Sequence, residues 1–577
     1  MYRPVLDAMG GSLLLTAILA MLPLLTLFVL LGALKVTAWK AALVGLVISL
    51  AVAIFAYGMP AGKALMATTE GAAFGFFPIL FIVINAIWIY NMTVVTGHFD
   101  VLRRSFAKIS DDQRIQGVIV AFCFGGLLEA LAGFGTPVAI SSVMLIALGF
   151  KPIKAATVAL VANTAPVAFG ALAVPITTLA SVTGLPEQEL SSIVGRQTPL
   201  LALFVPIVLV FLIDGAKGVK QTLPATLTSG ITFGLAQFVC SNYISIQLTD
   251  IVASLAAALS IVLLLRVWHP ALPYVPESDE VVAETGTRNA SRATASVGAS
   301  GAHDSGDHPI GQGTGTVSEL AERDRNTHDS SSDVAKAYAP YIIIIAVFSL
   351  ATLVPFIKSA LDSVTMTFRW PGLEGLQTAS GKASTLPNFK LNWLSGGGTL
   401  LIIAGLITIP FIGISPAKAF KAMLGTYVQL KFAIITVMAV LGLAYVMNSS
   451  GQTATLGLWM AGAGAAFALL SPILGWIGVA VTGSDTSSNA LFGALQVSAA
   501  NQAGLQPSLM AAGNTSGGVM GKMVSPQNLA IAAAAVGMSG KEGEIFRKVI
   551  GWSLGFLLFM MVLVFLQSTI LSFMVQI

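Results

Sequence analysis

Long apolar segments recur along almost the whole chain, separated by short polar stretches. Examples are residues 11–34, 74–96, 428–447 and 548–575. A helix needs about 20 apolar residues to cross the hydrocarbon core of a bilayer, and several segments reach this length. These segments do not alternate in the way that strands of a membrane barrel do. The pattern therefore predicts an all-α polytopic membrane protein with about 12–14 transmembrane helices, including re-entrant hairpins and broken helices.

Composition supports a protein that lies in the lipid bilayer. Hydrophobic residues make up 55% of the 577 positions and charged residues only 10%, whereas soluble domains carry about 25% charged residues. The 57 glycines and 25 prolines are typical of membrane helices that pack closely and are interrupted. The formal net charge of +4 and the lack of a basic stripe give no indication of a nucleic-acid partner.

One strongly polar segment divides the chain. Residues 270–336 are rich in Ser, Thr, Gly, Ala, Asp and Arg, with almost nothing to bury, and this composition predicts a disordered linker. It separates an N-terminal membrane half, residues 1–269, from a C-terminal membrane half, residues 337–577. A second polar stretch, 358–397, is interpreted as an ordered loop outside the membrane. Three histidines within the linker are interpreted as solvated residues rather than as a metal site: His303, His308 and His328.

Basic residues indicate the orientation of the chain. Loops on the cytoplasmic side of a membrane protein carry an excess of Lys and Arg. Two clusters are therefore predicted to lie in the cytoplasm, which directs the last helix outward: Arg103, Arg104, Lys108 and Arg114, and Lys541, Arg547 and Lys548.

Two regions on either side of the linker resemble each other. Gly483 and Thr486 follow Gly133 and Thr136 by 350 positions, and Asn514 follows Asn163 by 351. Each region places Asn-Thr, Gly and Pro inside an apolar run, and such residues interrupt a transmembrane helix. Interrupted helices at corresponding positions of two halves indicate a transporter site, because unwound backbone exposes carbonyls and helix ends at membrane depth. The parity of the crossings, and with it the relative direction of the two repeats, stays open.

Three charged residues interrupt apolar surroundings. Glu129 lies in an apolar stretch with no cation nearby in sequence, and a carboxylate at the bilayer centre costs at least about 2.5 kcal/mol. We therefore interpret it as a candidate proton carrier. Asp485 lies in a polar cluster, where a surface loop is an almost equally good interpretation. Lys522 is a candidate partner for a substrate carboxylate or for Asp485, with snorkelling to the interface as the alternative.

Motifs for catalysis and cofactor binding do not appear in the sequence. It contains no phosphate-binding loop, no Ser-His-Asp pattern, no zinc-ligand spacing and no flavin fingerprint. The two cysteines, Cys123 and Cys240, lie in apolar runs and are too few for a cysteine metal site. We therefore predict no enzyme activity, no metal and no cofactor.

Four strings from these regions also resemble the bacterial L-lactate permease family. They are LEALAGFGTPVA at 128–139, ANTAPVAFG at 162–170, TGSDTSSNALFG at 482–493 and GNTSGGVMGKMVSPQN at 513–528. With length and hydropathy, the resemblance covers nearly the whole chain. It implies secondary active transport of L-lactate, D-lactate and glycolate, coupled to protons, across a bacterial inner membrane.

The family is in turn similar to the ion-transporter superfamily. That similarity implies hairpin tips that bind carboxylates and sodium, and an elevator-type moving domain. The superfamily motif is Ser-Asn-Thr, whereas this chain has Ala162 and Gly513 in the first position. The departure weakens the expectation of a sodium site and favours proton coupling.

The resulting hypothesis is a proton–monocarboxylate symporter that acts as a monomer or a homodimer. The substrate carboxylate is expected between the two Asn-Thr breaks, and either Glu129 or Asp485 is expected to take the coupling proton. Sodium coupling, an intramembrane enzyme and a channel are the alternatives. The residues expected to bind substrate are Asn163, Thr164, Asn514, Thr515, Lys522, Ser487 and Thr136.

Overall fold

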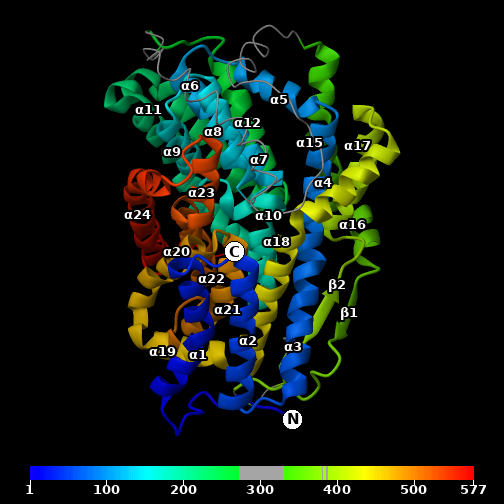
Figure 1. Cartoon of the computed structure of the whole chain (residues 1–577), viewed down its shortest axis with the longest axis vertical. Coiled ribbons are helices and arrows are strands. Elements are labelled where there is room, and N and C mark those ends of the chain that lie inside the picture. The colour runs from blue at the N-terminus through cyan, green and yellow to red at the C-terminus, as the bar shows by residue number, and fades with distance from the viewer. Residues whose placement is uncertain are drawn as a thin grey trace.

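A computed structural model describes residues 1–131, 133, 135–271, 274, 329–379, 381, 383–384 and 387–576. Helices make up almost all of this part, and most of them run along the long axis of the molecule (Figure 1). The predicted all-α membrane architecture is confirmed. The described sheet is a small antiparallel pair, β1 (Met366–Arg369) and β2 (Asn388–Leu391), in which Phe368 is opposite Phe389.

Helices from both halves of the chain form one layer of the molecule. The long helix α18 packs against α2, α3 and α4, while α17 packs against α4 and α15. Figure 1 shows these helices together on one side. Their bounds are α1 (Leu13–Phe28), α2 (Ala38–Ala51), α3 (Ala61–Phe74), α4 (Phe81–Val95), α5 (His98–Ala107), α15 (Ser331–Leu353), α16 (Pro355–Asp362), α17 (Gly397–Ile412) and α18 (Pro416–Ser450).

A second group of helices forms two similar units. The first unit is α6 (Gln113–Val118), a π-helical stretch (Ile119–Phe124), α7 (Gly125–Leu131), α8 (Thr136–Ala147), α9 (Pro152–Ala162) and α10 (Gly170–Thr183). The second unit is α20 (Phe467–Thr482), α21 (Asp485–Ala503), α22 (Pro507–Gly521) and α23 (Pro526–Ala535). In each unit a helical hairpin precedes an interrupted helix.

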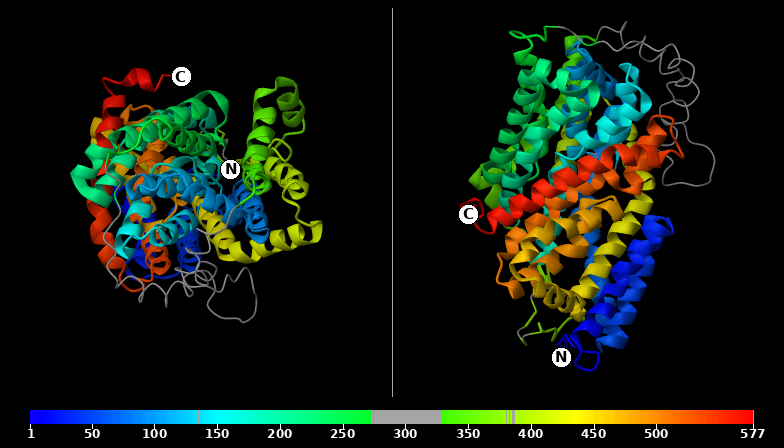
Figure 2. Two further views of the ribbon diagram at one scale, coloured as in Figure 1. Left: turned by 90° about the horizontal axis from the view of Figure 1, so that it is seen from above. Right: turned by 90° about the vertical axis from the view of Figure 1, so that its left-hand side faces the viewer.

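The two units point in opposite directions. In Figure 1, α7 and α8 form a hairpin that enters from the upper end, whereas α20 and α21 form one that enters from the lower end. The contacts between units are reciprocal, because α10 packs against α21 and α23 packs against α8. Figure 2 shows the same separation, with the α7–α8 region above and the α20–α21 region below. In the described structure the two hairpins therefore enter the molecule from opposite ends.

The longest helix, α11 (Glu187–Val239), folds back on itself. Its helical geometry fails at Asp214 and at Gly215, where φ is 65° and ψ is −162°, a conformation that is essentially restricted to glycine. The two arms are neighbours, because a Cβ on Gly234 would lie 3.0 Å from the carbonyl oxygen of Pro199. The second arm leads to α12 (Thr249–Leu264). Two further helices flank the second unit: α19 (Gln452–Met460) precedes α20, and α24 (Glu542–Gln567) follows α23.

The number of membrane-crossing helices differs from the sequence prediction. Within the described ranges, nine helices are long and apolar enough to cross a membrane, or ten if the bent pair Pro152–Ala162 and Val167–Thr183 forms one span. The predicted 12–14 is larger for two reasons. The two arms of α11, which are separated by the kink at Asp214 and Gly215, count here as one helix. Three apolar helices have only 10–17 residues, namely Thr136–Ala147, Thr249–Leu264 and Gly397–Ile412.

Most of the predicted linker, with His303, His308 and His328, lies outside the described residues. The last part of the predicted range, from Ser331 onward, is the start of α15. The second polar stretch, 358–397, holds the end of α16 and both strands. In Figure 1 these strands lie on the opposite half of the molecule from α5 and α6, which bracket the first basic cluster.

Close packing of α20 on α22 depends on glycine. A Cβ on Gly475 would lie 1.9 Å from the carbonyl oxygen of Asn514 and 2.7 Å from its carbonyl carbon. Overpacking usually costs about 1–3 kcal/mol, and here the clash is with backbone that cannot rotate away. We expect Gly475→Ala to lower the yield of monodisperse protein and its thermal midpoint in detergent.

The matched control for Gly475 is Gly551, in α24, where a Cβ would meet no atom within 4 Å. Gly551→Ala is expected to be neutral or stabilising, because alanine favours a helix over glycine by about 1 kcal/mol. Equal thermal midpoints for the two variants would contradict the proposed packing of α20 on α22.

Candidate functional site

The first interrupted helix breaks where the sequence predicts it. α9 ends at Ala162, and Asn163 is its C-cap. After a short turn and a 3-10 segment (Val167–Phe169), α10 begins, and the two parts are bent by 62°. Pro166 lacks an N–H group and disfavours helix at the residue before it. The local sequence Asn-Thr-Ala-Pro therefore accounts for the break.

The break continues into a left-handed turn. Ala171, Leu172 and Ala173 have φ values of 45°, 55° and 61°, although none of them is glycine. Each such residue costs about 1–2 kcal/mol, so the surrounding packing must impose the conformation. Leu172 and Ala173 are completely buried. Strained backbone of this kind clusters at functional sites.

Glu129 lies against this break and is 3% exposed. One carboxylate oxygen, Oε2, accepts a hydrogen bond of 2.9 Å from Asn163 Nδ2. The other, Oε1, accepts one of 2.5 Å from Lys522 Nζ. A Cβ on Gly170 would lie 2.8 Å from Oε1, so only glycine lets the carboxylate approach the break this closely. Three residues predicted for the site, Glu129, Asn163 and Lys522, are thus brought together.

Lys522 belongs to the break in the second unit. It begins a 3-10 turn (Lys522–Val524) between α22 and α23 and is 5% exposed. Interpreting Lys522 as snorkelling to the interface is therefore wrong. The expected partner was Asp485 or a substrate carboxylate, whereas the structure pairs Lys522 with Glu129. This ion pair joins the hairpin helix α7 of the first unit to the break of the second unit.

Asn528 joins the tips of the two hairpins, a role that the sequence analysis did not assign. Its Nδ2 donates to the carbonyl oxygens of Lys522, at 3.2 Å, and Gly483, at 3.4 Å. Its Oδ1 lies 3.4 Å from the position that a Cβ on Gly135 would take. The sequence did contain a signal for this role, because Asn528 places a side-chain amide next to an apolar run, two residues after Pro526.

The predicted helix break at Asn514 and Thr515 is wrong. Both residues lie inside an uninterrupted α22, and the break follows at Lys522–Ser525. The glycines around Asn514 serve packing instead, since a Cβ on Gly517 would lie 2.2 Å from the carbonyl oxygen of Pro472 in α20. Composition alone does not distinguish glycines that permit close packing from glycines that mark a break.

Asn514 and Thr515 instead belong to a buried cluster around Asn489. Both donate to Asn489 Oδ1, at 2.9 and 3.0 Å. Asn489 in turn donates to the carbonyl oxygen of Pro175 in α10, at 3.0 Å, and Gln496 donates to Asn514 Oδ1 at 3.1 Å. The cluster therefore connects α22 and α21 of the second unit with α10 of the first.

The other predicted site residues make no hydrogen bond or ion pair to Glu129 or Lys522 in the described structure, although Asp485 lies close enough to Lys522 for their charges to interact. Asp485 is 3% exposed, and among the described residues neither carboxylate oxygen has a hydrogen-bond partner. A Cβ on Gly518, one turn before Lys522, would lie 2.3 Å from Asp485 Oδ1. Thr164 donates to Val161, three residues back. Thr136 is the first residue of α8, and Ser487 is the third residue of α21, so both lie at the start of the second helix of a hairpin.

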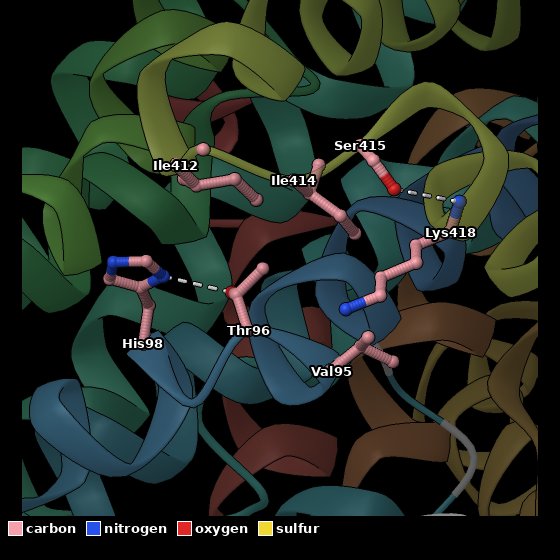
Figure 3. Close-up of a pocket in the computed structure, with 8 residues that line it drawn as sticks. Val95, Thr96, His98, Ile412, Ile414, Ser415 and Lys418 are labelled. Atoms are coloured by element: carbon pink, nitrogen blue, oxygen red, sulfur yellow. Dashed lines mark hydrogen bonds between the residues drawn. The ribbon is translucent and has the colours of Figure 1, made fainter.

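A pocket of about 370 Å³ lies away from this site, between α4, α5 and the turn after α17. Figure 3 shows His98 and Lys418 on opposite sides of it, with the imidazole Nδ1 2.8 Å from Thr96 Oγ1. Burial and the charge of Lys336 lower the pKa of His98, so the ring is neutral at neutral pH. The pocket touches neither interrupted helix.

The amino-acid sequence is similar to known membrane transport proteins over almost its whole length. The profile of the L-lactate permease family matches residues 16–571. The glycolate permease GlcA of Escherichia coli K12 is 39% identical over 582 residues, which cover 99% of this chain and 98% of that one. The L-lactate permease of Bacillus subtilis 168 is 37% identical over 593 residues, covering 100% and 99%. The L-lactate permease of Escherichia coli K12 is 38% identical over 577 residues, covering 98% of each.

Two solved structures share much less sequence with this chain. MtrF of Neisseria gonorrhoeae aligns over 88% of this chain and 84% of its own, with a TM-score of 0.46 and 12% identity. YdaH of Alcanivorax borkumensis aligns over 88% and 87%, with a TM-score of 0.43 and 13% identity.

The family match and the apolar helices confirm the predictions of a multi-pass integral membrane protein, in bacteria one of the inner membrane, and of a transporter rather than an enzyme. The resemblance that four short strings indicated extends over nearly the full length of the relatives. The chain therefore belongs to the L-lactate permease family.

Proposed function

We propose that this chain is a proton-coupled symporter of short 2-hydroxy monocarboxylates, namely L-lactate, D-lactate and glycolate. The substrate class follows from relatives named L-lactate permease and glycolate permease that match over nearly their whole length. The coupling is argued from a single observation, the buried ion pair between Glu129 and Lys522.

Lys522 is the buried cation that a substrate carboxylate would need. In the described structure Glu129 already occupies it, at 2.5 Å. An anionic substrate that binds Lys522 therefore leaves Glu129 as an unpaired buried carboxylate, at a cost of several kcal/mol. Protonation of Glu129 removes that cost. Substrate and proton thus bind together, because the substrate takes Lys522 away from Glu129 and the proton neutralises the Glu129 carboxylate that is left.

The transport cycle follows from this competition. A proton enters from the outer side and neutralises Glu129, Lys522 is released, and the substrate carboxylate takes its place. The loaded site carries no uncompensated charge on these three groups, so reorientation exposes no buried ion to lipid. On the inner side the proton leaves Glu129, the carboxylate re-forms its pair with Lys522, and the substrate is expelled.

The neighbouring polar groups complete the proposed site. Asn163 Oδ1 is buried and has no partner among the described residues, so it is free to accept a hydrogen bond from the substrate hydroxyl. We assign the hydroxyls of Ser487 and Thr136 to the same part of the substrate. We assign Asn514, Thr515 and Thr164 the supporting role of holding the two interrupted helices. Asp485 remains the second candidate for proton transfer.

We further propose that the two inverted units move as one body against the layer that contains α1–α4 and α15–α18. The reciprocal packing of α10 on α21 and of α23 on α8 ties the units together. Such a body carries the Glu129–Lys522 pair with it, because both residues lie inside the units. This corresponds to an elevator-type transporter.

Labelled L-lactate uptake into proteoliposomes tests the proposed coupling. An inward proton gradient without sodium is expected to drive transient accumulation above equilibrium, and an uncoupler is expected to abolish it. Lactate that only equilibrates under a proton gradient would contradict proton symport.

Sodium coupling is the second candidate, because both carboxylate oxygens of buried Asp485 lack a partner in the described structure. Accumulation that follows an inward sodium gradient at constant pH would favour it. In that case Asp485→Asn, rather than Glu129→Gln, is expected to abolish accumulation.

A further inference from the structure

A third buried carboxylate lies close to the first break, and neither the sequence analysis nor the proposed cycle uses it. Asp250 is in the first turn of α12 and is completely buried. Its Oδ2 has no hydrogen-bond partner among the described residues, and no ion pair to a cation is found there either. One turn later on the same helix, the hydroxyl of Ser254 is also buried without a partner.

Asp250 is connected to the interrupted helix through one amide. Gln237 Nε2, on the second arm of α11, donates to Asp250 Oδ1 at 3.0 Å and to the carbonyl oxygen of Ala165 at 3.3 Å. Ala165 lies in the break, two residues after Asn163. Thr198, on the first arm, donates to Gln237 Oε1 at 3.2 Å and so fixes which side of the amide faces Asp250.

The same face of α12 approaches the helix that carries Glu129. A Cβ on Gly126 would lie 2.6 Å from the hydroxyl oxygen of Ser254, and Gly126 is three residues before Glu129 on α7. Glu129 and Cys240 are the titratable groups close enough to interact electrostatically with Asp250. Of the other elements packed on α12, α10 carries no titratable residue and the π-helical stretch Ile119–Phe124 carries only Cys123. The π-helical segment Cys240–Ile244 adds Tyr243 to Cys240. The charged residues of α11 are Glu187, Glu189, Arg196, Asp214, Lys217 and Lys220.

Asp250 and Glu129 differ in how their charge is compensated. Glu129 has Lys522, whereas Asp250 has only an uncharged amide. A buried carboxylate without a cation is costly, so this conformation favours the neutral acid. Resting on the proposed proton symport, we propose that Asp250 binds and releases a second coupling proton, in step with rearrangement of the break at Ala165.

The step involves one O–H bond. A proton taken from water on the outer side binds a carboxylate oxygen of Asp250, and the same proton returns to water on the inner side, so that no other bond changes. Gln237 links the protonation of Asp250 to the conformation of the break, because one amide group donates to both Asp250 and Ala165. With Glu129 as the first site, two protons then accompany one substrate anion, and transport moves one net positive charge inward.

The test is the proton-to-lactate ratio of purified full-length protein in proteoliposomes. The ratio is obtained from the lactate gradient at which net lactate flux is zero, measured at several pH gradients and at several membrane potentials set by potassium and valinomycin. A two-proton carrier responds to the membrane potential, whereas a one-proton carrier is electroneutral and responds to the pH gradient alone. The wild type is expected to show about two protons per lactate, and Asp250→Asn one fewer. Asp250→Glu keeps a titratable group and is expected to keep the wild-type ratio.

Glu187→Gln is the matched control. Glu187 is a partly exposed carboxylate at the start of α11 whose Oε1 accepts from Thr177 Oγ1 at 2.6 Å, and its replacement is expected to leave the ratio unchanged. Equal ratios for wild type and Asp250→Asn would show that Asp250 keeps its proton permanently and would overturn the inference, while proton symport stands. Absence of any proton coupling in wild type would instead overturn the proposed function.

If Asp250→Asn fails to fold, lactate-induced infrared difference spectra of the wild type and of Asp250→Glu provide a second test. Lactate addition is expected to change a protonated-carboxyl band in the wild type, and this band is expected to shift in Asp250→Glu. A lactate-induced spectrum without such a shift would contradict the assignment.

Discussion

The Glu129→Gln variant is expected to exchange lactate across the membrane but to accumulate much less of it under a proton gradient. Glutamine resembles the neutral, protonated form of the carboxyl group, so Lys522 is released permanently and the substrate binds without a proton. Binding and reorientation persist, while the link between substrate and proton gradient at this site is lost. We expect this variant to separate the two activities most clearly.

Two assays on the same proteoliposomes measure this separation. Counterflow of labelled lactate against internal unlabelled lactate reports exchange, and uptake under an imposed proton gradient reports accumulation. Glu129→Asp, which keeps the carboxylate, serves as the control and is expected to accumulate more lactate than Glu129→Gln does. If Glu129→Gln accumulates lactate like the wild type, Glu129 does not carry the proton, and Asp485 becomes the leading candidate.

Replacing Lys522 by Met is expected to abolish both exchange and accumulation. The substrate carboxylate loses its cation, and Glu129 loses its partner at the same time. Truncating one member of a buried charge pair costs about 2–5 kcal/mol, and each 1.4 kcal/mol is a factor of about ten in affinity. Lactate counterflow is therefore expected to fall by at least about 30-fold.

Stability measurements distinguish lost binding from lost folding. Lys522→Met alone leaves a buried carboxylate, and breaking such a pair costs about 3–5 kcal/mol. The double variant Glu129→Gln/Lys522→Met removes both charges and is expected to recover most of the thermal midpoint, but no transport. Lys421→Met changes an exposed lysine of α18 and serves as the control. Wild-type counterflow in Lys522→Met would rule out the proposed carboxylate partner.

Local sequence predicted the elements whose cause is local. The apolar segment at 11–34 becomes a membrane-length helical segment, Leu13–Ala33, because length and hydropathy are properties of the segment itself. The break after Asn163 was predicted for the same reason, since Pro166 acts on its immediate neighbours. The prediction failed at Asn514, because the glycines there accommodate the backbone of α20, which the local sequence does not reveal.

The functional pair depended on tertiary structure. Glu129 and Lys522 are 393 positions apart, and the sequence indicated only that each is a charge in apolar surroundings. The hydrogen bond from Gln237 to Asp250 likewise follows from the fold of α11 at Gly215 and its packing on α12. Asp250 was not singled out, because an acid at the edge of an apolar run is also common at helix ends.

The sequence by itself determined that the chain lies in a membrane, which family it resembles and which buried charges require an explanation, because these depend on residue type and local order. Only the tertiary structure decided which charges meet, where the helices break and that the two hairpins enter from opposite ends. The reason is that a buried charge takes its partner from whichever helix packs beside it, and packing joins segments without regard to their distance along the chain.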